Sequence, residues 1–158
     1  MKTLRTFLSV FAFTLLLCTS CTENDENLID NTAQIQELVD TFITGSWRVT
    51  NFNDSGQDET NDFTSYNFTF DSNGTVVATN GNETINGTWS VTDSSSSSSN
   101  SSGGDIDFNL FFNVSTTHNF DDLNDDWDIV SVSSTEVSLI DISGGNGGTD
   151  RLTFTKNP

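Results

Sequence analysis

Eight short runs rich in Phe, Val, Ile, Thr and Trp, separated by turn residues, take up more than half of the chain that follows Gly45. Each run is predicted to be a β-strand, and alternation with a period of two places the apolar side chains of a strand on one dry face. Tyr66, Phe68 and Phe70 show this most clearly. The predicted strands are 46–53, 62–71, 75–80, 83–92, 105–113, 126–132, 136–142 and 150–156.

The connections between these runs favour antiparallel pairing of sequence neighbours. Residues 71–74 and 80–82 are tight hairpin signals rich in Asn and Gly, which only antiparallel neighbours can use. Eight such strands close most simply into a barrel, because closure removes the exposed edge strands. The predicted fold class is therefore all-β, an eight-stranded antiparallel up-and-down barrel; a two-sheet sandwich is the alternative.

One short N-terminal helix is predicted ahead of the strands, over 31–45. Ile35, Leu38, Val39 and Phe42 form one apolar stripe at helical spacing, and Gly45 is typical of a helix stop. Together, 31–158 are predicted to be one barrel domain, with a Ser/Gly-rich loop over 94–104. In the sixth and seventh strands both faces carry apolar residues, so their inward sets remain open and one face is expected to meet the helix.

The junction between helix and first strand carries a resemblance. Gly45-Ser46-Trp47 opens the first strand, and the last strand ends Phe154-Thr155-Lys156. This order of helix, Gly-any-Trp motif and eight strands resembles lipocalin-like (calycin-type) domains over 31–156, although the family's other loop motif, between the sixth and seventh strands, is missing. The resemblance implies that the tryptophan enters the barrel at its closed end, under a basic residue of the last strand.

Strand parity points independently to the same pair. In an up-and-down barrel the first strand starts where the eighth ends, so Trp47 and Lys156 are predicted to form a structural latch, with the ammonium over the indole. A solvated terminal lysine is the alternative. Parity also places the connections 53–61, 80–82, 114–125 and 143–149 at the end away from the helix. That mouth is predicted to be acidic, with Asp54, Asp58, Glu59, Asp62, Glu83, Asp121, Asp122, Asp125, Asp126 and Asp150.

The inward aromatic residues leave two interpretations of the barrel interior. An eight-stranded barrel has room for its own side chains or for one small ligand. A hollow barrel would bind a small apolar or cationic ligand, whereas a filled barrel would bind only through its rim loops. The candidate ligand-binding residues are Tyr66, Phe68, Phe70, Trp89, Phe108 and Phe112.

A run of acids after the fifth strand suggests a weak cation site. Asp122, Asn124, Asp126 and Asp128 alternate as in the start of an EF-hand calcium loop. Trp127 stands where that loop needs glycine and Ser133 where it needs a bidentate glutamate, which excludes a tight site. Weak surface calcium binding is the hypothesis, and no other cofactor is expected; the alternative is that these acids cap a short helical turn and keep the rim soluble.

Enzyme activity is not expected. His118 is the sole histidine of the chain, so neither a zinc triad nor a Ser-His-Asp arrangement can be assembled. Carboxylates are abundant, but none lies in an apolar sequence setting of the kind that raises the pKa of a catalytic acid.

The N-terminus predicts export and lipid attachment. Lys2 and Arg5 precede an apolar run over 7–18, which is shorter than the ~20 residues of a membrane-spanning helix and typical of a signal peptide. Thr19 and Ser20 then precede Cys21, which resembles the lipobox of bacterial lipoproteins except that Cys18 replaces the usual leucine. The resemblance implies a signal peptide over 1–20 and lipidation of Cys21; the alternative is an ordinary secretory signal.

Localisation and partners follow from the anchor and from charge. Residues 21–30 are predicted to be an acidic tether, and 22–26 resemble a short surface-export tag, although a plain solvated tether fits equally. Beyond residue 20 the chain has 3 basic and 23 acidic residues, hence a net charge of −20. Such a surface repels phosphates and excludes a nucleic-acid partner.

The predicted function is therefore that of a lipid-anchored outer-membrane protein, which is exposed at the cell surface if residues 22–26 act as an export tag. Its barrel is expected to bind a small ligand or a partner protein. The alternative is a structural surface scaffold with a filled barrel and no small-molecule ligand.

Overall fold

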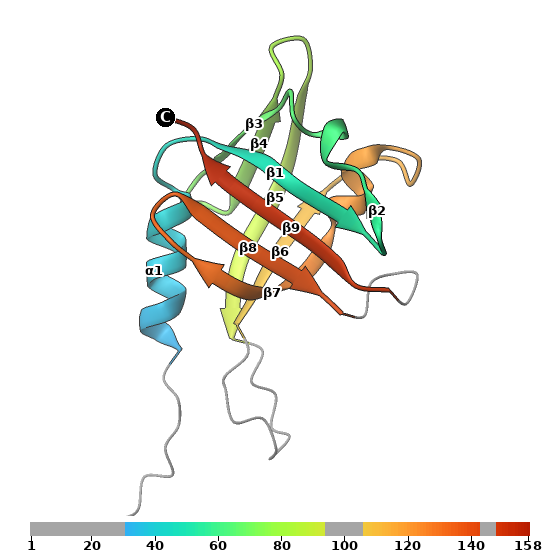
Figure 1. The fold of residues 1–158 in the computed structure, drawn as a ribbon. Helices are drawn as coiled ribbons and strands as arrows, with labels where there is room; N and C mark the ends of the chain where they lie inside the picture. The colour runs from blue at the N-terminus through green and yellow to red at the C-terminus, as the bar shows by residue number, and fades with distance from the viewer. Residues whose placement is uncertain (1–30, 94–105, 143–147) are drawn as a thin grey trace, which may run out of the picture.

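Antiparallel pairing runs through the chain in sequence order and returns to its start. The computed structural model describes residues 31–93, 106–142 and 148–158. Its elements, labelled in Figure 1, are α1 (Thr32–Phe42), β1 (Trp47–Asp54), β2 (Gln57–Asp58), the 3-10 segment η1 (Thr60–Asp62), β3 (Asn67–Phe70), β4 (Thr75–Thr79), β5 (Thr84–Asp93), β6 (Ile106–Phe112), the 3-10 segment η2 (Asn119–Leu123), β7 (Asp125–Val132), β8 (Glu136–Asp141) and β9 (Asp150–Lys156).

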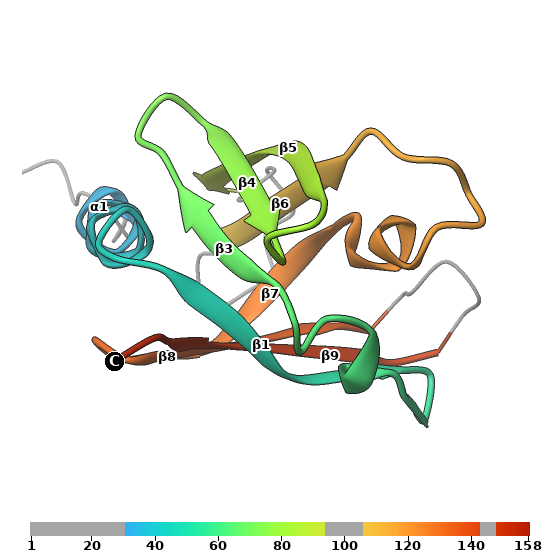
Figure 2. The same ribbon diagram turned by 90° about the horizontal axis from the view of Figure 1, so that it is seen from above.

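The sheet closes on itself. β1 pairs with β9 from Trp47 opposite Lys156 to Asn53 opposite Arg151, and β2 is only a two-residue extension of β1. The remaining strands form an eight-stranded barrel in the order β1-β3-β4-β5-β6-β7-β8-β9. The predicted up-and-down barrel with one short helix is thereby confirmed, and the sandwich alternative is wrong. Viewed from above, β4 to β6 form one wall and β1, β8 and β9 the opposite one (Figure 2).

The helix is shorter than predicted, and a tight corner at Gly45 connects it to β1. α1 ends at Phe42 rather than at residue 45, and Asn31 makes no side-chain capping bond. Leu38 and Phe42 are its buried residues. Gly45 has a φ of +82°, and a Cβ there would lie 2.9 Å from Cε of Lys156. Glycine is therefore required at this corner both for the left-handed backbone and for the close approach of the last strand.

The predicted strand 62–71 is wrong in its first half. The 3-10 segment η1 ends at Asp62, a turn without strand pairing follows over 63–66, and only 67–70 form a strand. The physical reason is that the Thr60 side chain accepts a hydrogen bond from the backbone N–H of Phe52 (2.8 Å), which folds this segment onto β1. The turn buries Phe63 completely, 5.2 Å from the ring of Phe52.

This detour leaves β1 and β3 joined by one bridge, Trp47 opposite Phe68. The C-terminal segment reinforces that seam. The Asn157 side-chain amide donates to the hydroxyl of Ser46 (2.9 Å) and to the side-chain oxygen of Asn67 (2.8 Å). A residue beyond the last strand therefore ties the start of β1 to the start of β3.

A β-bulge explains why both faces of β7 are apolar. The pairing of β7 with β8 shifts between Ile129 and Ser131. The extra residue reverses the alternation, so that Trp127 is buried, Ile129 and Val132 pack against the core, and Val130 is exposed. In β8 the buried set is Val137, Leu139 and Asp141.

Candidate functional site

The helix end of the barrel is filled by aromatic rings. Phe42 of α1 projects inside and stacks on Phe108 with 4.5 Å between ring centroids. It also contacts Trp47 (5.2 Å), Phe70 (4.8 Å) and Trp89 (5.8 Å). Three of the six candidate ligand-binding residues, Phe70, Trp89 and Phe108, are thus packed around a helix side chain.

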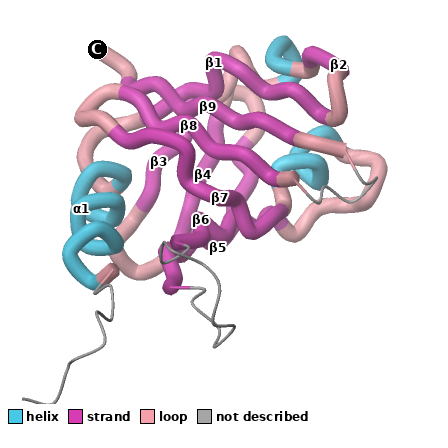
Figure 3. The backbone as a smooth tube through the Cα atoms, turned by 60° about the horizontal axis from the view of Figure 1, so that its bottom comes forward, coloured by secondary structure: helices cyan, strands magenta, loops and turns pink. Residues whose placement is uncertain are grey.

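The opposite end is closed by a second aromatic cluster. Phe120 of η2 is 1 % exposed and lies 4.8 Å from Tyr66, 5.8 Å from Phe68 and 4.9 Å from Phe112, measured between centroids. Phe63 packs against it at 5.4 Å. Figure 3 shows α1 at one end of the barrel and the two 3-10 segments at the other. The end predicted to be an open mouth is therefore plugged, and the other three candidate residues belong to the plug.

The short helical turn that was the alternative to a calcium site is present as η2, but the sequence reasoning did not predict that Phe120 of this turn would close the barrel. His118 precedes a turn that carries Asp121 and Asp122, and acids in the first turn are typical of a helical N-terminus. The imidazole Nδ1 of His118 accepts the N–H of Phe120 (3.2 Å), so this side chain caps η2. Capping holds Phe120 at the angle at which its ring enters the barrel.

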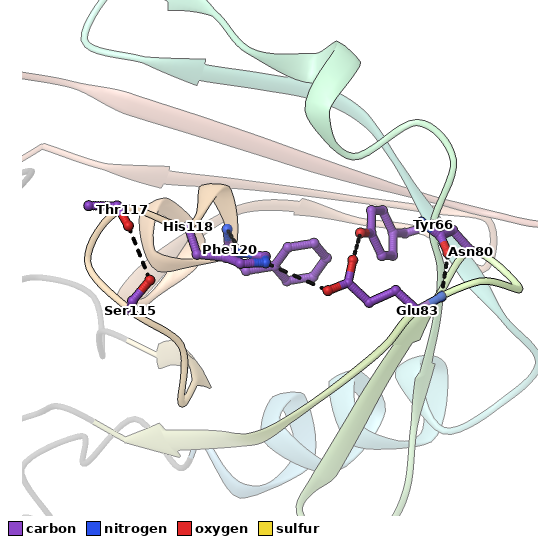
Figure 4. Close-up of polar contacts among 7 residues, drawn as sticks. All are labelled: Tyr66, Asn80, Glu83, Ser115, Thr117, His118 and Phe120. Carbon is purple, nitrogen blue, oxygen red and sulfur yellow. Dashed lines mark hydrogen bonds and ion pairs between the residues drawn. The ribbon is translucent and has the colours of Figure 1, made fainter.

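The plug is tied to the β4–β5 hairpin by a short polar chain (Figure 4). The Tyr66 hydroxyl donates to the Glu83 carboxylate (2.7 Å), whose other oxygen lies 4.0 Å from Nε2 of His118. Because Nδ1 of His118 is an acceptor, the ring proton is on Nε2 and faces Glu83. Burial and the hydrogen bond to Glu83 raise the pKa of Tyr66. These contacts join three segments at the rim: the residue before β3, the β4–β5 hairpin and the 114–118 connection.

The predicted latch residues meet at the helix end. Nζ of Lys156 lies 5.6 Å from the ring centroid of Trp47, within the range of a cation–π contact. The indole Nε1 donates to the backbone carbonyl of Phe42 (3.0 Å), which satisfies its only polar group. Trp47 thus fastens the end of α1 to the first and last strands.

Only part of the predicted acidic mouth forms one cluster. Burial, followed by the carboxylates of Asp122, Asp54 and Asp62, raises the pKa of Glu59. Burial also raises the pKa of Asp122, with Asp54, Asp121, Asp62 and Asp150 as further causes. Asp150 accepts the N–H and hydroxyl of Ser55 (2.8 and 3.1 Å) and so closes the β1–β2 turn. Asp58 differs, because hydrogen bonds from Thr60 lower its pKa.

Asp125 is the acid of this predicted mouth whose pKa is raised furthest. Burial raises its pKa to about 6, and the nearby carboxylates of Asp141 and Asp126 add to the rise. Its folded-state pKa thus exceeds the ordinary value of 3.8. The folded protein holds this proton more tightly than the unfolded chain, so the stabilising effect is present at low pH and is lost as pH rises through about 6.

Wild-type protein is therefore expected to have a lower urea midpoint at pH 7.5 than at pH 5. Asp125→Asn retains an oxygen that can accept the N–H of Asp126, and it is expected to flatten this pH dependence and raise the midpoint at pH 7.5. The exposed Asp71→Asn is the matched control and should leave the slope unchanged. An unaltered slope in Asp125→Asn contradicts the assignment.

The four candidate calcium ligands lie on different elements. Asp122 belongs to η2, whereas Asp126 and Asp128 are exposed on β7. The Asn124 side chain donates to the carbonyl of Phe112 (3.0 Å) and accepts its N–H, which ties β6 to the plug. Within the described part of the chain no group of three His, Cys, Asp or Glu residues is arranged to hold a metal ion. Calcium binding stays a prediction.

Hollows of about 520, 680 and 730 Å³ are present in the described part of the protein, the second of them between α1, Ser134 and Lys156. One groove of about 520 Å³ runs between α1 and the β6–β7 wall and is lined by Gln34, Glu37, Leu38, Ile106, Asp128, Ile129 and Val132. A broader hollow of about 730 Å³ lies on β5, β6 and β7 and includes Phe111 and Asp126.

The predicted lipidation residue, Cys21, lies outside the described residues. No helix in the described ranges is long and apolar enough to cross a membrane.

Among known proteins, this chain has likenesses only to solved structures. No protein-family model and no curated protein matches the chain. A matching solved structure is the crystal structure of a DUF4847 family protein from Bacteroides vulgatus ATCC 8482. It is 20 % identical, with a TM-score of 0.49, over 76 % of this chain and 97 % of that one. Such a similarity concerns the fold and carries no information on function.

Proposed function

We propose that this chain is an outer-membrane protein, lipid-anchored through Cys21, that serves as a non-enzymatic binding module with a filled barrel. It engages a partner protein through its outer surface. The single observation that carries the filled barrel is the unbroken aromatic packing from Phe42 at the helix end to Phe120 at the plug.

The packing supports the filled barrel because it uses the side chains that a carrier would need for its ligand. Phe154 bridges the two clusters, 5.9 Å from Phe42 and 5.3 Å from Phe68 between centroids. A ligand in the barrel would have to displace rings that are at most 9 % exposed. Removing such contacts costs ~3–5 kcal/mol per large aromatic side chain, more than a small ligand readily recovers.

A neutral apolar dye distinguishes the filled barrel from a carrier. N-phenyl-1-naphthylamine suits this protein, since it avoids the repulsion that an anionic dye meets at a net charge of −20. Full-length protein in detergent is expected to show no saturable energy transfer from tryptophan to the dye beyond that of the detergent alone. Saturable binding of one dye per chain, with quenching of tryptophan, would overturn the filled barrel and favour the small-ligand carrier.

Lipid attachment is expected to depend wholly on Cys21. Three acyl chains hold a protein permanently at a bilayer, so wild type should fractionate with membranes and Cys21→Ser should become soluble. Intact mass should also fall by the mass of the acyl chains. Cys18→Ser is the matched control and should stay membrane-bound, because residue 18 is removed with the signal. Equal partitioning of wild type and Cys21→Ser into detergent would refute the anchor.

A further inference from the structure

The hollow on the outer face of β5, β6 and β7 is built from three adjacent strands. Thr88 lies opposite Phe111, and Ser90 lies opposite Asn109, which in turn lies opposite Asp126. All five line the hollow. They share one face of the sheet, because residues two apart on a strand and residues directly opposite one another point to the same side. We refer to this surface as the Phe111 hollow.

Phe111 is an exception among the phenylalanines of the described residues. Its side chain is 54 % exposed, whereas every other phenylalanine there is at most 1 % exposed. Its neighbour Phe112 already supplies the inward ring at this level of the barrel. Phe111 therefore adds exposed apolar surface to a strongly charged protein without adding to its core, and this surface lies in the hollow.

Charge is distributed unevenly around the barrel. The three basic residues of the described chain, Arg48, Arg151 and Lys156, all belong to β1 and β9. In the strand order these strands lie diametrically opposite the β5–β6 pair that carries the hollow, as Figure 2 shows. On the hollow's side Asp107 and Asp128 face one another directly across β6 and β7, an arrangement that disfavours the sheet. The potential at this wall is therefore negative and attracts cations.

The spacing of the ring and the carboxylate suits one type of side chain. Phe111 lies two residues along β6 from Asn109, the direct neighbour of Asp126, so the Cα atoms of Phe111 and Asp126 are diagonal neighbours ~7–8 Å apart, within reach of both side chains. A lysine or arginine laid across this diagonal puts its charge between the aromatic face and the carboxylate. Thr88, Ser90 and Asn109 surround that position with polar groups.

We propose that the Phe111 hollow binds a lysine or arginine side chain of the partner protein, with the cation over the Phe111 ring and Asp126 as its counter-charge. This inference rests on the proposed function and names the chemistry of its partner. Charge complementarity decides the occupant, because an apolar or acidic partner segment would meet the same carboxylates at a cost.

Binding of a fluorescent octalysine amide to the full-length protein in detergent, followed by anisotropy, tests the proposal. Phe111→Leu keeps the apolar area but removes the aromatic face, and it is expected to weaken binding about fivefold or more. Phe111→Tyr keeps the face and should bind within about twofold of wild type. Asp126→Asn should weaken binding to a similar extent as Phe111→Leu.

Two matched controls separate the hollow from general attraction to an acidic protein. Val130→Ala removes apolar surface from a residue that is 57 % exposed on the same wall, and Glu136→Gln removes one exposed charge from β8. Both should bind within about twofold of wild type. Equal weakening in Phe111→Leu, Val130→Ala and Glu136→Gln would overturn the hollow. So would binding of neutral maltoheptaose that depends on Phe111 in the absence of octalysine binding.

Failure here is distinguishable from failure of the proposed function. If octalysine binding ignores Phe111 while the dye stays excluded and Cys21→Ser is released, the module stands and the assigned surface is wrong. If the dye enters the wild-type barrel, the filled barrel itself is wrong, whatever octalysine does.

Discussion

Phe42→Ala is expected to lower the free energy of unfolding by ~3–5 kcal/mol, the usual cost of removing a large aromatic side chain from a core. The ring is fully buried and contacts five other aromatic residues of the barrel. It also holds α1 against the barrel end, since Leu38 is the other buried residue of the helix. Alanine at 42 therefore leaves a cavity and loosens the helix at once.

Urea unfolding of full-length protein in a mild detergent, followed by tryptophan fluorescence, measures this change. Ile43→Ala is the control, because it removes a side chain of the next residue that is 37 % exposed. The control is expected to cost no more than ~1 kcal/mol. A loss below ~1 kcal/mol in Phe42→Ala would show that the helix residue does not belong to the core.

Phe120→Ala is expected to produce a comparable loss, ~3–5 kcal/mol, and in addition to open the barrel. Phe120 is the central ring of the plug, with Phe63, Tyr66, Phe68 and Phe112 around it. Removing it from a 3-10 segment at the rim leaves an apolar space beside solvent. Apolar cavities of this kind accept small apolar ligands.

The same dye that is excluded from wild type should therefore bind Phe120→Ala at one site per chain. Phe111→Ala, which removes an exposed ring of the same size, should change stability by less than ~0.5 kcal/mol and should not admit the dye. Destabilisation without dye binding would mean that the rim collapses onto the interior. A stable Phe120→Ala variant would contradict the plug.

The strand pattern could be predicted because it depends on local chemistry. Alternation identified Phe68 and Phe70 as inward, and the tight turns specified antiparallel neighbours, from which closure of eight strands follows. Parity also placed Trp47 beside Lys156, since it depends only on the number of strands between them. The inward position of the six candidate residues followed in the same way.

The bulge in β7 and the 3-10 segment that begins at Thr60 were not predicted, and the reason is the same for both. Each is stabilised by a partner distant in sequence or on a neighbouring strand. The Thr60 hydroxyl needs the backbone of Phe52, and the apolar pattern over Ile129, Val130 and Val132 is ambiguous until β8 fixes the register. No local propensity encodes either contact.

The sequence by itself determined a closed antiparallel barrel behind a short helix, because side-chain alternation and turn residues act over a few neighbouring positions. Only the tertiary structure decided how the interior is occupied. Whether Tyr66, Phe112 and their neighbours line a cavity depends on which other rings reach them. Phe42 and Phe120 come from elements outside the strands, and packing in three dimensions decides where their rings enter the barrel. The alternation of residues along a strand carries no information about these rings.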